Sequence, residues 1–172
     1  MNYEQSIDYI HSIPKFRRPL GNANLEKLLT QLDNPQKKLK FIHIAGTNGK
    51  GSTAAMTAEI LKKSGFKTGL FTSPYLEVFN ERIRINGENI TDNNLAEYVT
   101  RVKAIMEENN ALVSEFAFIT AVSFLYFYEK QCDIVVLEVG MGGKLDATNV
   151  IDSSLVSVIC KIGLDHTQYL GD

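Results

Sequence analysis

Phe41-Ile-His-Ile-Ala-Gly-Thr-Asn-Gly-Lys-Gly-Ser-Thr53 is the stretch around which the rest of this 172-residue sequence is organised. Its apolar start predicts a short strand, and Ser52 and Thr53 open a run of helix formers. The glycines between strand and helix can adopt positive φ and let the backbone approach a phosphate closely. The free N–H groups of a helix N-terminus attract the anion, and Lys50 adds a mobile positive charge. The segment therefore predicts a phosphate site, with a nucleoside triphosphate as its ligand.

The spacing of this glycine turn differs from the common P-loop pattern G-x-x-x-x-G-K-[ST]. Counting back from Gly49, the first glycine should fall at Ile44, and Gly51 stands where the pattern has Ser or Thr. A strand-to-helix turn that needs glycine only for close packing would look similar. Three glycines, a lysine and two hydroxyls together favour phosphate binding. The residues expected to contact the nucleotide are Thr47, Asn48, Gly49, Lys50, Gly51 and Ser52.

Composition and charge narrow the class of protein. Hydrophobic residues make up 44% of the chain and charged residues 22%, which is ordinary for a soluble globular domain. A net charge of -2 and a pI near 5.9 argue against a nucleic-acid partner. Neither a membrane span nor a signal peptide is expected, because the sequence lacks an apolar run of the required length and a basic start. Cys132 and Cys160 lie in or beside apolar runs, as buried reduced thiols of a cytoplasmic protein would.

Apolar runs typical of strands alternate with segments of helical periodicity along the chain. This alternation predicts an α/β domain with a mainly parallel sheet flanked by helices. The runs at 134–139 and 155–159 are nearly continuous, so both are expected to be strands buried on both faces. Asn86-Gly87, between alternating Ile and Arg or polar residues, predicts a small hairpin. We also expect Asn24 to cap one helix and Ser114 to begin another that is rich in aromatic residues.

Polar residues lie at or just beyond the carboxyl ends of the expected strands, where ligands bind in such sheets. Glu138 falls in an otherwise apolar run, and burying a carboxylate without a partner is expensive. It therefore either pairs with a basic side chain or binds a hard divalent cation such as Mg²⁺. Ser73, Glu138 and His166 could supply part of a magnesium shell. His166 is equally compatible with a loop histidine or with a donor that only supports the site.

A second glycine-rich loop, Gly140-Met-Gly-Gly-Lys-Leu-Asp-Ala-Thr-Asn149, follows the strand that contains Glu138. Its glycines allow the chain to run close to a ligand, and Asp146, Thr148 and Asn149 offer hydrogen bonds. A simple connecting loop rarely concentrates these residues, so the sequence favours a ligand site here.

Five segments, taken together and in order, resemble the folylpolyglutamate synthase / dihydrofolate synthase family, a branch of the Mur ligase superfamily. Their order and spacing match the family from the N-terminal helix to the last residue. The segments are IHIAGTNGKGST at 42–53, TSPYL at 72–76, NERIRING at 80–87, EVGMGGKLDATN at 138–149 and LDHTQYLG at 164–171.

The resemblance implies a P-loop NTPase-like fold, that of the Mur ligase central domain, with a small hairpin and Ω-loop insertion. It implies an ATP-dependent acid–amino-acid ligase that adds L-glutamate to the carboxylate of tetrahydrofolate, of its polyglutamates or of dihydropteroate. The carboxylate attacks the γ-phosphate of MgATP, and the glutamate amine then displaces phosphate from the acyl phosphate. Lys50, Glu138 and His166 take catalytic roles by this resemblance, and Ser73, Glu138 and His166 match the family's magnesium ligands.

The resemblance also implies where the folate or pterin binds. The stretch from Tyr75 to Arg84 resembles a mobile Ω-loop that closes over this site. Phe116 is either a stacking surface or a core aromatic. Ala117, Lys144 and Asn22 depart from the commonest family residues, which bears on the choice of acceptor rather than on the chemistry. The residues expected on this side are Gly21, in the Leu20-Gly21 loop, with Arg82, Ser114, Phe116 and Asp146.

Residues 1–172 are expected to form the ATP-binding domain, incomplete at its C-terminal end. In the family a lysine that becomes carbamylated and a C-terminal glutamate-ligase domain come later, so this chain alone is expected to be inactive. Family members are commonly monomers. Three alternatives stay open: a P-loop NTPase or small-molecule kinase, a non-catalytic nucleotide-binding module, and a ligase acting on cell-wall precursors.

Overall fold

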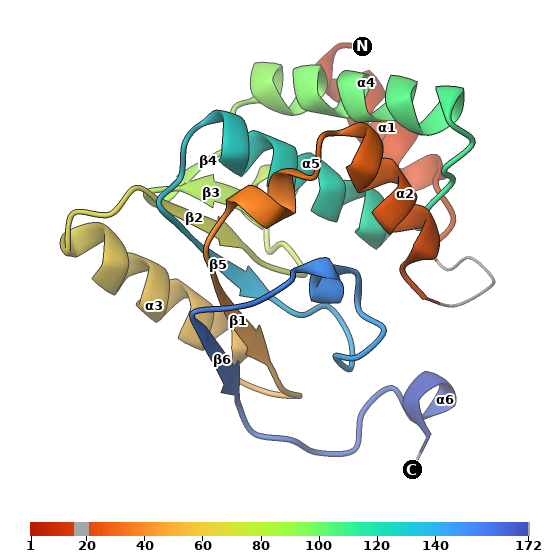
Figure 1. Cartoon of the computed structure of the whole chain (residues 1–172). Helices are drawn as coiled ribbons and strands as arrows, with labels where there is room; N and C mark the ends of the chain where they lie inside the picture. Colours follow the sequence, from red (N-terminus) through yellow and green to blue (C-terminus); the bar gives the residue numbers. More distant parts are fainter. Residues whose placement is uncertain (16–20, 172) are drawn as a thin grey trace.

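The computed structural model describes residues 1–15 and 21–171, so Leu20 of the expected substrate loop lies outside the described residues. A single sheet has the strand order β4-β3-β2-β5-β1-β6 (Figure 1). The neighbours β2, β5, β1 and β6 are parallel, whereas β3 and β4 run antiparallel at one edge. The strands are β1 Phe41–Ala45, β2 Thr68–Phe71, β3 Ile83–Ile85, β4 Glu88–Asn89, β5 Ile134–Glu138 and β6 Val156–Ile159.

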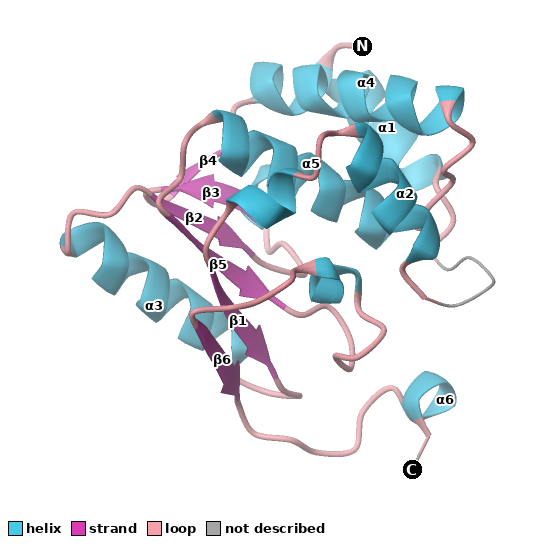
Figure 2. Ribbon diagram, viewed as in Figure 1, coloured by secondary structure: helices cyan, strands magenta, loops and turns pink. Residues whose placement is uncertain are grey.

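Helices cover both faces of this sheet, which confirms the predicted α/β architecture (Figure 2). Helix α3 packs on one face, where Ala54 meets Ile44, Leu70 and Val136 of three strands. The other face is covered by α5, and α1, α2 and α4 pack around α5 in turn. The helices are α1 Tyr3–Ser12, α2 Ala23–Gln31, α3 Lys50–Lys63, α4 Asp92–Glu108, α5 Glu115–Glu129 and α6 Thr167–Leu170.

Helix α5 forms the centre of the larger core. Its residues from Ala117 to Phe127 are all buried, so the helix is apolar on every side. Phe124 meets Phe41 of β1 edge to face, with 5.6 Å between the ring centroids. This dense packing fixes the distance between the sheet and the outer helices. The aromatic density at 116–127 is therefore mainly core.

The predicted hairpin and the predicted start of a helix at Ser114 are confirmed. Asn86 and Gly87 both have positive φ, 52° and 82°, as the tight turn between β3 and β4 requires. Ser114 accepts a hydrogen bond from the N–H of Ala117 as the N-cap of α5. The prediction that Asn24 caps α2 is wrong, because Asn22 holds the cap position and Asn24 lies inside the helix. The Asn24 amide instead donates to the carbonyl of Leu112, a tertiary contact that local sequence does not encode.

The strand at 155–159 was expected to be buried on both faces, and this is a second correction. Strand β6 is the edge of the sheet and pairs only with β1 among the described strands. Its side chains are largely exposed, with Ile159 at 70% of its full accessibility. The central strand β5, by contrast, is buried throughout, as its continuous apolar run predicted.

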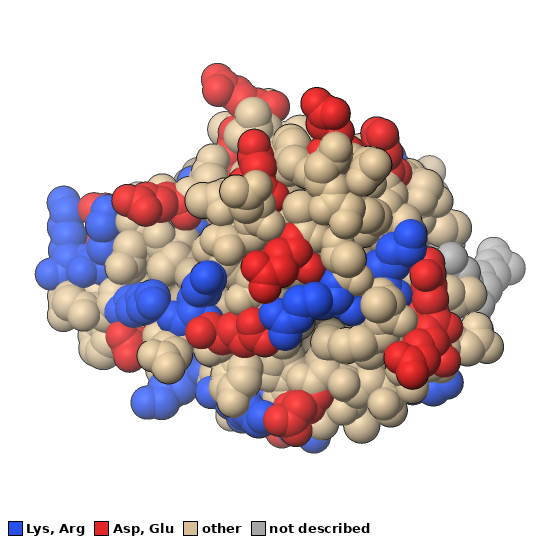
Figure 3. Space-filling view, turned by 90° about the horizontal axis from the view of Figure 1, so that it is seen from above, with Lys and Arg blue, Asp and Glu red and all other residues tan. Residues whose placement is uncertain are grey.

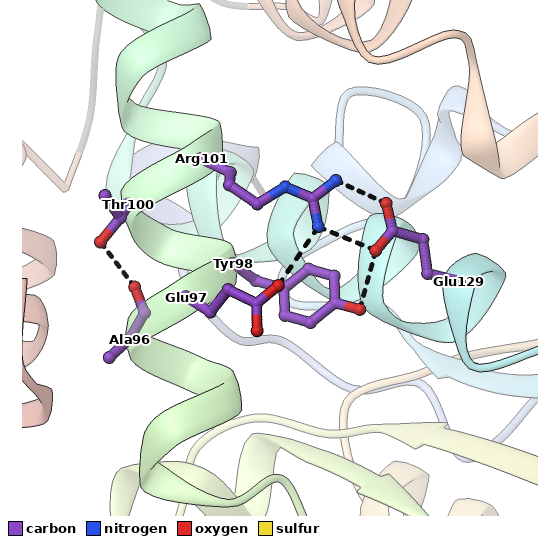
Figure 4. Close-up of polar contacts among 6 residues, drawn as sticks. All are labelled: Ala96, Glu97, Tyr98, Thr100, Arg101 and Glu129. Atoms are coloured by element: carbon purple, nitrogen blue, oxygen red, sulfur yellow. Dashed lines mark hydrogen bonds and ion pairs between the residues drawn. The ribbon is translucent and has the colours of Figure 1, made fainter.

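A polar cluster ties α4 to α5 on the outer side of the fold (Figure 4). Glu129 of α5 accepts hydrogen bonds from both terminal nitrogens of Arg101 and, at 2.9 Å, from the Tyr98 hydroxyl. A bidentate arginine–carboxylate pair is more geometrically specific than a lysine pair. The Arg101 hydrogen bonds, as the largest cause, hold the pKa of Glu129 below its ordinary value.

The surface mixes both signs of charge. On the face seen in Figure 3, acidic and basic side chains are interspersed rather than separated. In the part of the chain that the structure describes, no helix has the length and apolarity needed to cross a bilayer. Both cysteines are free: Cys132 is buried and Cys160 is half-buried. Burial raises the pKa of the Cys132 thiol to about 12, so it stays protonated at neutral pH.

Candidate active site

The carboxyl ends of β1, β2 and β5 lie side by side because these strands are parallel neighbours. Ile44 is in register with Glu138 across β1 and β5, and Phe71 is in register with Leu137 across β2 and β5. The glycine turn after β1, the loop after β2 and the second glycine loop after β5 therefore start from one edge of the sheet. The sequence predicted a site at this edge from residues of these three loops and from His166, which follows β6.

The glycine turn leads directly into the N-terminus of α3. Gly49 is the N-cap, with φ 84°, a left-handed conformation that favours glycine. The first hydrogen bond of the helix runs from Thr53 N–H to Gly49 O, so the N–H groups of Lys50, Gly51 and Ser52 come before it. These N–H groups and the positive end of the helix dipole lie where the sequence predicted a phosphate site, which remains a prediction.

The first part of the turn is held from within the protein. The N–H groups of Thr47 and Asn48 both donate to the carbonyl of Lys161, at 2.9 and 3.2 Å. The Thr47 hydroxyl donates to Gly163 O and accepts from Gly163 N–H. Two of the six expected nucleotide contacts thus already have backbone partners in the chain that follows β6. Lys50 reaches back over the turn, with Nζ 3.4 Å from Thr47 O.

Glu138 lies beside the start of α3. Its side chain is buried, and Oε2 accepts a hydrogen bond from Ser73 N–H at 3.0 Å. A Cβ added at Gly51 would lie 3.7 Å from the same oxygen, so the carboxylate faces the first turn of the helix. Burial raises the pKa of Glu138, and the Ser73 hydrogen bond and the charges of Lys50 and Arg82 act in the opposite direction. Of the expected metal ligands Ser73, Glu138 and His166, the structure joins Ser73 to Glu138, and Lys50 lies close enough for its charge to act on Glu138.

His166 is not part of this convergence. It precedes α6 in a left-handed conformation, with φ 49°, and its side chain is exposed. Its N–H donates to the Asp165 carboxylate, and its Nε2 lies 3.8 Å from that carboxylate. Within residues 1–15 and 21–171, no hydrogen bond or ion pair joins His166 to Glu138 or Ser73. Its role as a metal ligand remains a prediction.

The second glycine loop is organised by Asp146. One carboxylate oxygen accepts from Met141 N–H at 2.9 Å, and the other accepts from the N–H and the hydroxyl of Thr148. The carboxylate therefore joins the beginning of the loop to its end. Asn22, next to Gly21, donates its amide to Asp146 O at 2.9 Å. The contacts thus bring the expected substrate residues Gly21 and Asp146 to neighbouring positions.

His43 is a residue of this edge that the sequence reasoning missed. Its Nε2 lies 2.8 Å from Thr148 Oγ1. Because that hydroxyl already donates to Asp146 at 2.6 Å, it accepts from His43, which fixes the imidazole proton on Nε2. Burial lowers the pKa of His43, with the Asp146 charge opposing the shift. The available signal was a histidine inside an apolar strand.

The other expected substrate residues lie around the start of α5. Phe116 packs on Phe71, with 5.8 Å between ring centroids, and a Cβ at Gly140 would lie only 2.6 Å from its ring. Its contacts are those of a core aromatic that remains partly exposed. Arg82 is half-buried, and its guanidinium lies against the rings of both Tyr75 and Phe79. Its Nε is buried and lacks a hydrogen-bond partner among the described residues.

Comparison with known proteins shows which family this chain belongs to. The Mur ligase middle domain model matches residues 44–172. A folylpolyglutamate synthase of Lacticaseibacillus casei is 44% identical over 176 residues, covering 99% of this chain and 41% of the relative. A dihydrofolate synthase/folylpolyglutamate synthase of Bacillus subtilis is 40% identical, covering 99% of this chain and 40% of the relative. An FPGS–AMPPCP–folate complex superimposes with a TM-score of 0.94 at 43% identity, over 100% of this chain and 43% of that structure.

The fold and the family model define a Mur ligase middle domain, and the chain belongs to the Mur ligase family. Within that family it is similar to folylpolyglutamate and dihydrofolate synthases. The chain spans about two fifths of the length of these curated relatives, at 41% and 40%.

Proposed function

We propose that this chain is the ATP-binding domain, residues 1–172, of a ligase that joins L-glutamate to a folate-type carboxylate. The acceptor is tetrahydrofolate with its polyglutamates, dihydropteroate, or both, and ADP and phosphate are the other products. The similarity to folylpolyglutamate and dihydrofolate synthases supports the acceptor class. ATP as the phosphoryl donor is supported by the complex of a similar protein with AMPPCP, an analogue of ATP. We further propose a monomer that works in the cytoplasm.

One observation carries the proposal: the buried Glu138 carboxylate beside the N-terminus of α3. A negative group at that point would repel a triphosphate bound on the same helix end. A divalent cation held by this carboxylate would offset the repulsion. The oxygens of Glu138 and Ser73 are hard ligands of the kind that Mg²⁺ takes, and Mg²⁺ keeps its remaining positions for phosphate and water. The donor chemistry therefore fits magnesium, which when bound would screen the phosphate charge.

The chain's own residues then have distinct roles. The N–H groups of Lys50, Gly51 and Ser52 bind and orient the phosphates, and the Lys50 ammonium follows the charge that develops on the transferred group. Ser73 N–H holds Glu138 in place. Thr47 and Asn48 keep the turn in shape through their bonds to Lys161. Arg82 supplies a positive charge on the acceptor side.

The reaction balances as two displacements. An oxygen of the acceptor carboxylate attacks the γ-phosphorus, the bond to the β,γ-bridging oxygen breaks, and ADP leaves. The glutamate nitrogen then attacks the acyl carbon, the carbon–oxygen bond to phosphate breaks, and the amine loses a proton. Positioning and charge neutralisation provide most of the rate enhancement in such transfers.

The test measures ATP-dependent incorporation of labelled glutamate into dihydropteroate and into tetrahydrofolate, side by side. It uses the natural protein that carries this chain. We expect ADP to form only when both an acceptor and glutamate are present. Incorporation into both acceptors would identify a bifunctional synthase, and incorporation into tetrahydrofolate alone a polyglutamylating enzyme. ADP formation with neither acceptor would contradict the proposal and favour an NTPase.

A further inference from the structure

The carboxylate of Glu81 is surrounded by the backbone of its own loop. Oε2 accepts from Leu76 N–H at 2.8 Å, and Oε1 accepts from the N–H groups of Glu77 and Val78, both at 3.1 Å. Three consecutive N–H groups therefore converge on one side chain. The backbone N–H of Glu81 donates in turn to Val78 O at 3.1 Å, so both the backbone and the side chain of Glu81 are bonded to the segment.

These hydrogen bonds fix the conformation of the 76–78 segment, which has few packing contacts. Leu76 is 90% exposed and Val78 is 48% exposed, so apolar burial contributes little to their conformation. Backbone N–H groups in such a loop would otherwise bond to water and leave the chain free to adopt many conformations. A carboxylate that accepts several N–H groups selects one of these conformations.

The selected conformation positions two aromatic rings. Tyr75 and Phe79 flank the 76–78 segment, and their rings lie 5.6 Å apart. The Arg82 guanidinium carbon lies 5.3 Å from the Tyr75 ring centroid and 5.4 Å from that of Phe79. Because Glu81 precedes Arg82 directly, the same short helix, Phe79–Arg82, carries the carboxylate and the guanidinium.

Phe79, which lies beside Tyr75 and Arg82, contacts helix α1. His11 of α1 packs edge to face on Phe79, at 5.7 Å between centroids, and its Nδ1 lies 3.2 Å from the Glu115 carboxylate. Phe79 is thereby fixed to the body of the protein, whereas the 76–78 segment depends on Glu81. The backbone N–H donors, with Leu76 as the largest cause, hold the pKa of Glu81 below its ordinary value, as expected of a carboxylate used in its charged form.

We propose that Glu81 is a positioning residue that fixes the 76–78 segment and thereby holds Tyr75 against Arg82 on the acceptor side of the active site. The acceptor part of this inference rests on the proposed function. Glu81 does not touch the reacting atoms in this account. It acts through the orientation of the Arg82 guanidinium, which binds the anionic or electron-rich part of the acceptor.

The test compares Glu81→Gln with Glu77→Gln in the natural protein that carries this chain. Glutamine at 81 keeps one acceptor oxygen and turns the other into an N–H donor that faces a backbone N–H. The control, Glu77→Gln, removes the same charge from the same loop. The Glu77 side chain makes no hydrogen bond or ion pair among the described residues. Amide hydrogen exchange at Leu76, Glu77 and Val78 is measured together with KM and kcat for the acceptor.

We expect exchange at these three amides to be about tenfold faster in Glu81→Gln than in the control, with exchange in β5 unchanged. The KM for the acceptor should rise about tenfold while kcat stays within about twofold, because the lost interaction orients the ligand rather than the transferred phosphoryl group. Glu81→Asp, which keeps the charge on a shorter side chain, should give intermediate values.

Unchanged exchange in Glu81→Gln would overturn the inference. Faster exchange with an unchanged KM would also overturn it, since the segment would then have no part in holding Arg82. These results differ from failure of the proposed function, in which the unaltered protein joins no glutamate to any folate. In that case Arg82 has no role in acceptor binding, and the exchange data still decide whether Glu81 fixes the 76–78 segment.

Discussion

Ser73 N–H donates to Glu138 Oε2 at 3.0 Å, although the two residues are 65 positions apart in the sequence. The contact joins the loop after β2 to the end of β5, two parallel neighbours in the centre of the sheet. It therefore places the only charged side chain of β5 at a fixed distance from the glycine turn and α3. The charge balance at this point is the basis of the first two predictions.

Glu138→Gln should reduce ligation by about a hundredfold or more, because the amide keeps the size and the Ser73 hydrogen bond but loses the charge that a cation requires. Stability should be unchanged or slightly higher, since burial disfavours the carboxylate. The measurements are kcat and the thermal midpoint. Glu97→Gln, which alters an exposed carboxylate on α4, is the control. Activity within a few-fold of the unaltered protein would remove Glu138 from the mechanism.

Lys50→Ala should reduce turnover by about a hundredfold or more and leave the fold intact, since Lys50 lies over the glycine turn and contributes one weak backbone contact at 3.4 Å. Turnover and the far-UV circular dichroism spectrum are measured together. Lys67→Ala, at the opposite ends of the strands, is a matched loss of charge and should have little effect on turnover. Equal turnover in the two variants would contradict the role of Lys50.

Gly46→Ala should destabilise the protein by about 1–3 kcal/mol, because the new Cβ would lie 2.8 Å from Cys160 Cβ and φ is 137°. Urea unfolding measures this difference in free energy. Gly143→Ala is the control, since a Cβ there meets no atom within 4 Å and φ is not in the left-handed region. A stability loss as large in the control as at Gly46 would count against the close contact as the cause.

Thr148→Val should lower the free energy of unfolding by about 1–3 kcal/mol, because the buried hydroxyl serves both His43 and Asp146. The change should also alter the second glycine loop, which Asp146 closes through Met141. Unfolding experiments and the NMR shift of the His43 imidazole provide the two readouts. An unshifted imidazole resonance would show that the hydrogen bond is absent in solution.

The Arg101–Glu129 pair predicts a pH dependence. The folded-state pKa of Glu129 is below its ordinary value of 4.5, so the pair stabilises the protein above about pH 4.5. This stabilisation is lost as the pH falls through the folded-state pKa. The stability difference between the unaltered protein and Glu129→Gln should therefore shrink in acid. A difference that stays constant from pH 7 down to about pH 3 would contradict this assignment.

The elements that depend on local signals were predictable from the sequence. The Gly46–Gly51 turn, the Asn86-Gly87 hairpin and the buried β5 all follow from backbone freedom or from periodicity over a few residues. The cap of α2 was misassigned, because Asn24 is used in a tertiary contact instead. The burial of β6 was also wrong, since a run of apolar residues does not reveal whether its strand lies at the centre or the edge of a sheet.

Some residues of the candidate site could likewise be predicted from the sequence, and others could not. The sequence placed Lys50, Glu138 and Ser73 at one edge of the sheet, because polar residues at the ends of parallel strands share that edge. The interactions of His43 with Thr148, and of Glu81 with the N–H groups of 76–78, depend on side-chain placement that no spacing rule encodes. His166 is the reverse case. The sequence motif predicts it as a metal ligand, but its observed hydrogen bond is to the carboxylate of its neighbour Asp165.

Transfer of isotope from the acceptor to phosphate tests the central claim most directly. The acceptor carboxylate is labelled with ¹⁸O and incubated with ATP, glutamate and the natural protein that carries this chain. Attack of that carboxylate on the γ-phosphorus predicts one ¹⁸O atom in the released phosphate for each amide formed, with the other retained in the amide carbonyl. Phosphate that carries oxygen only from water or ATP, with no label from the acceptor, would contradict the account.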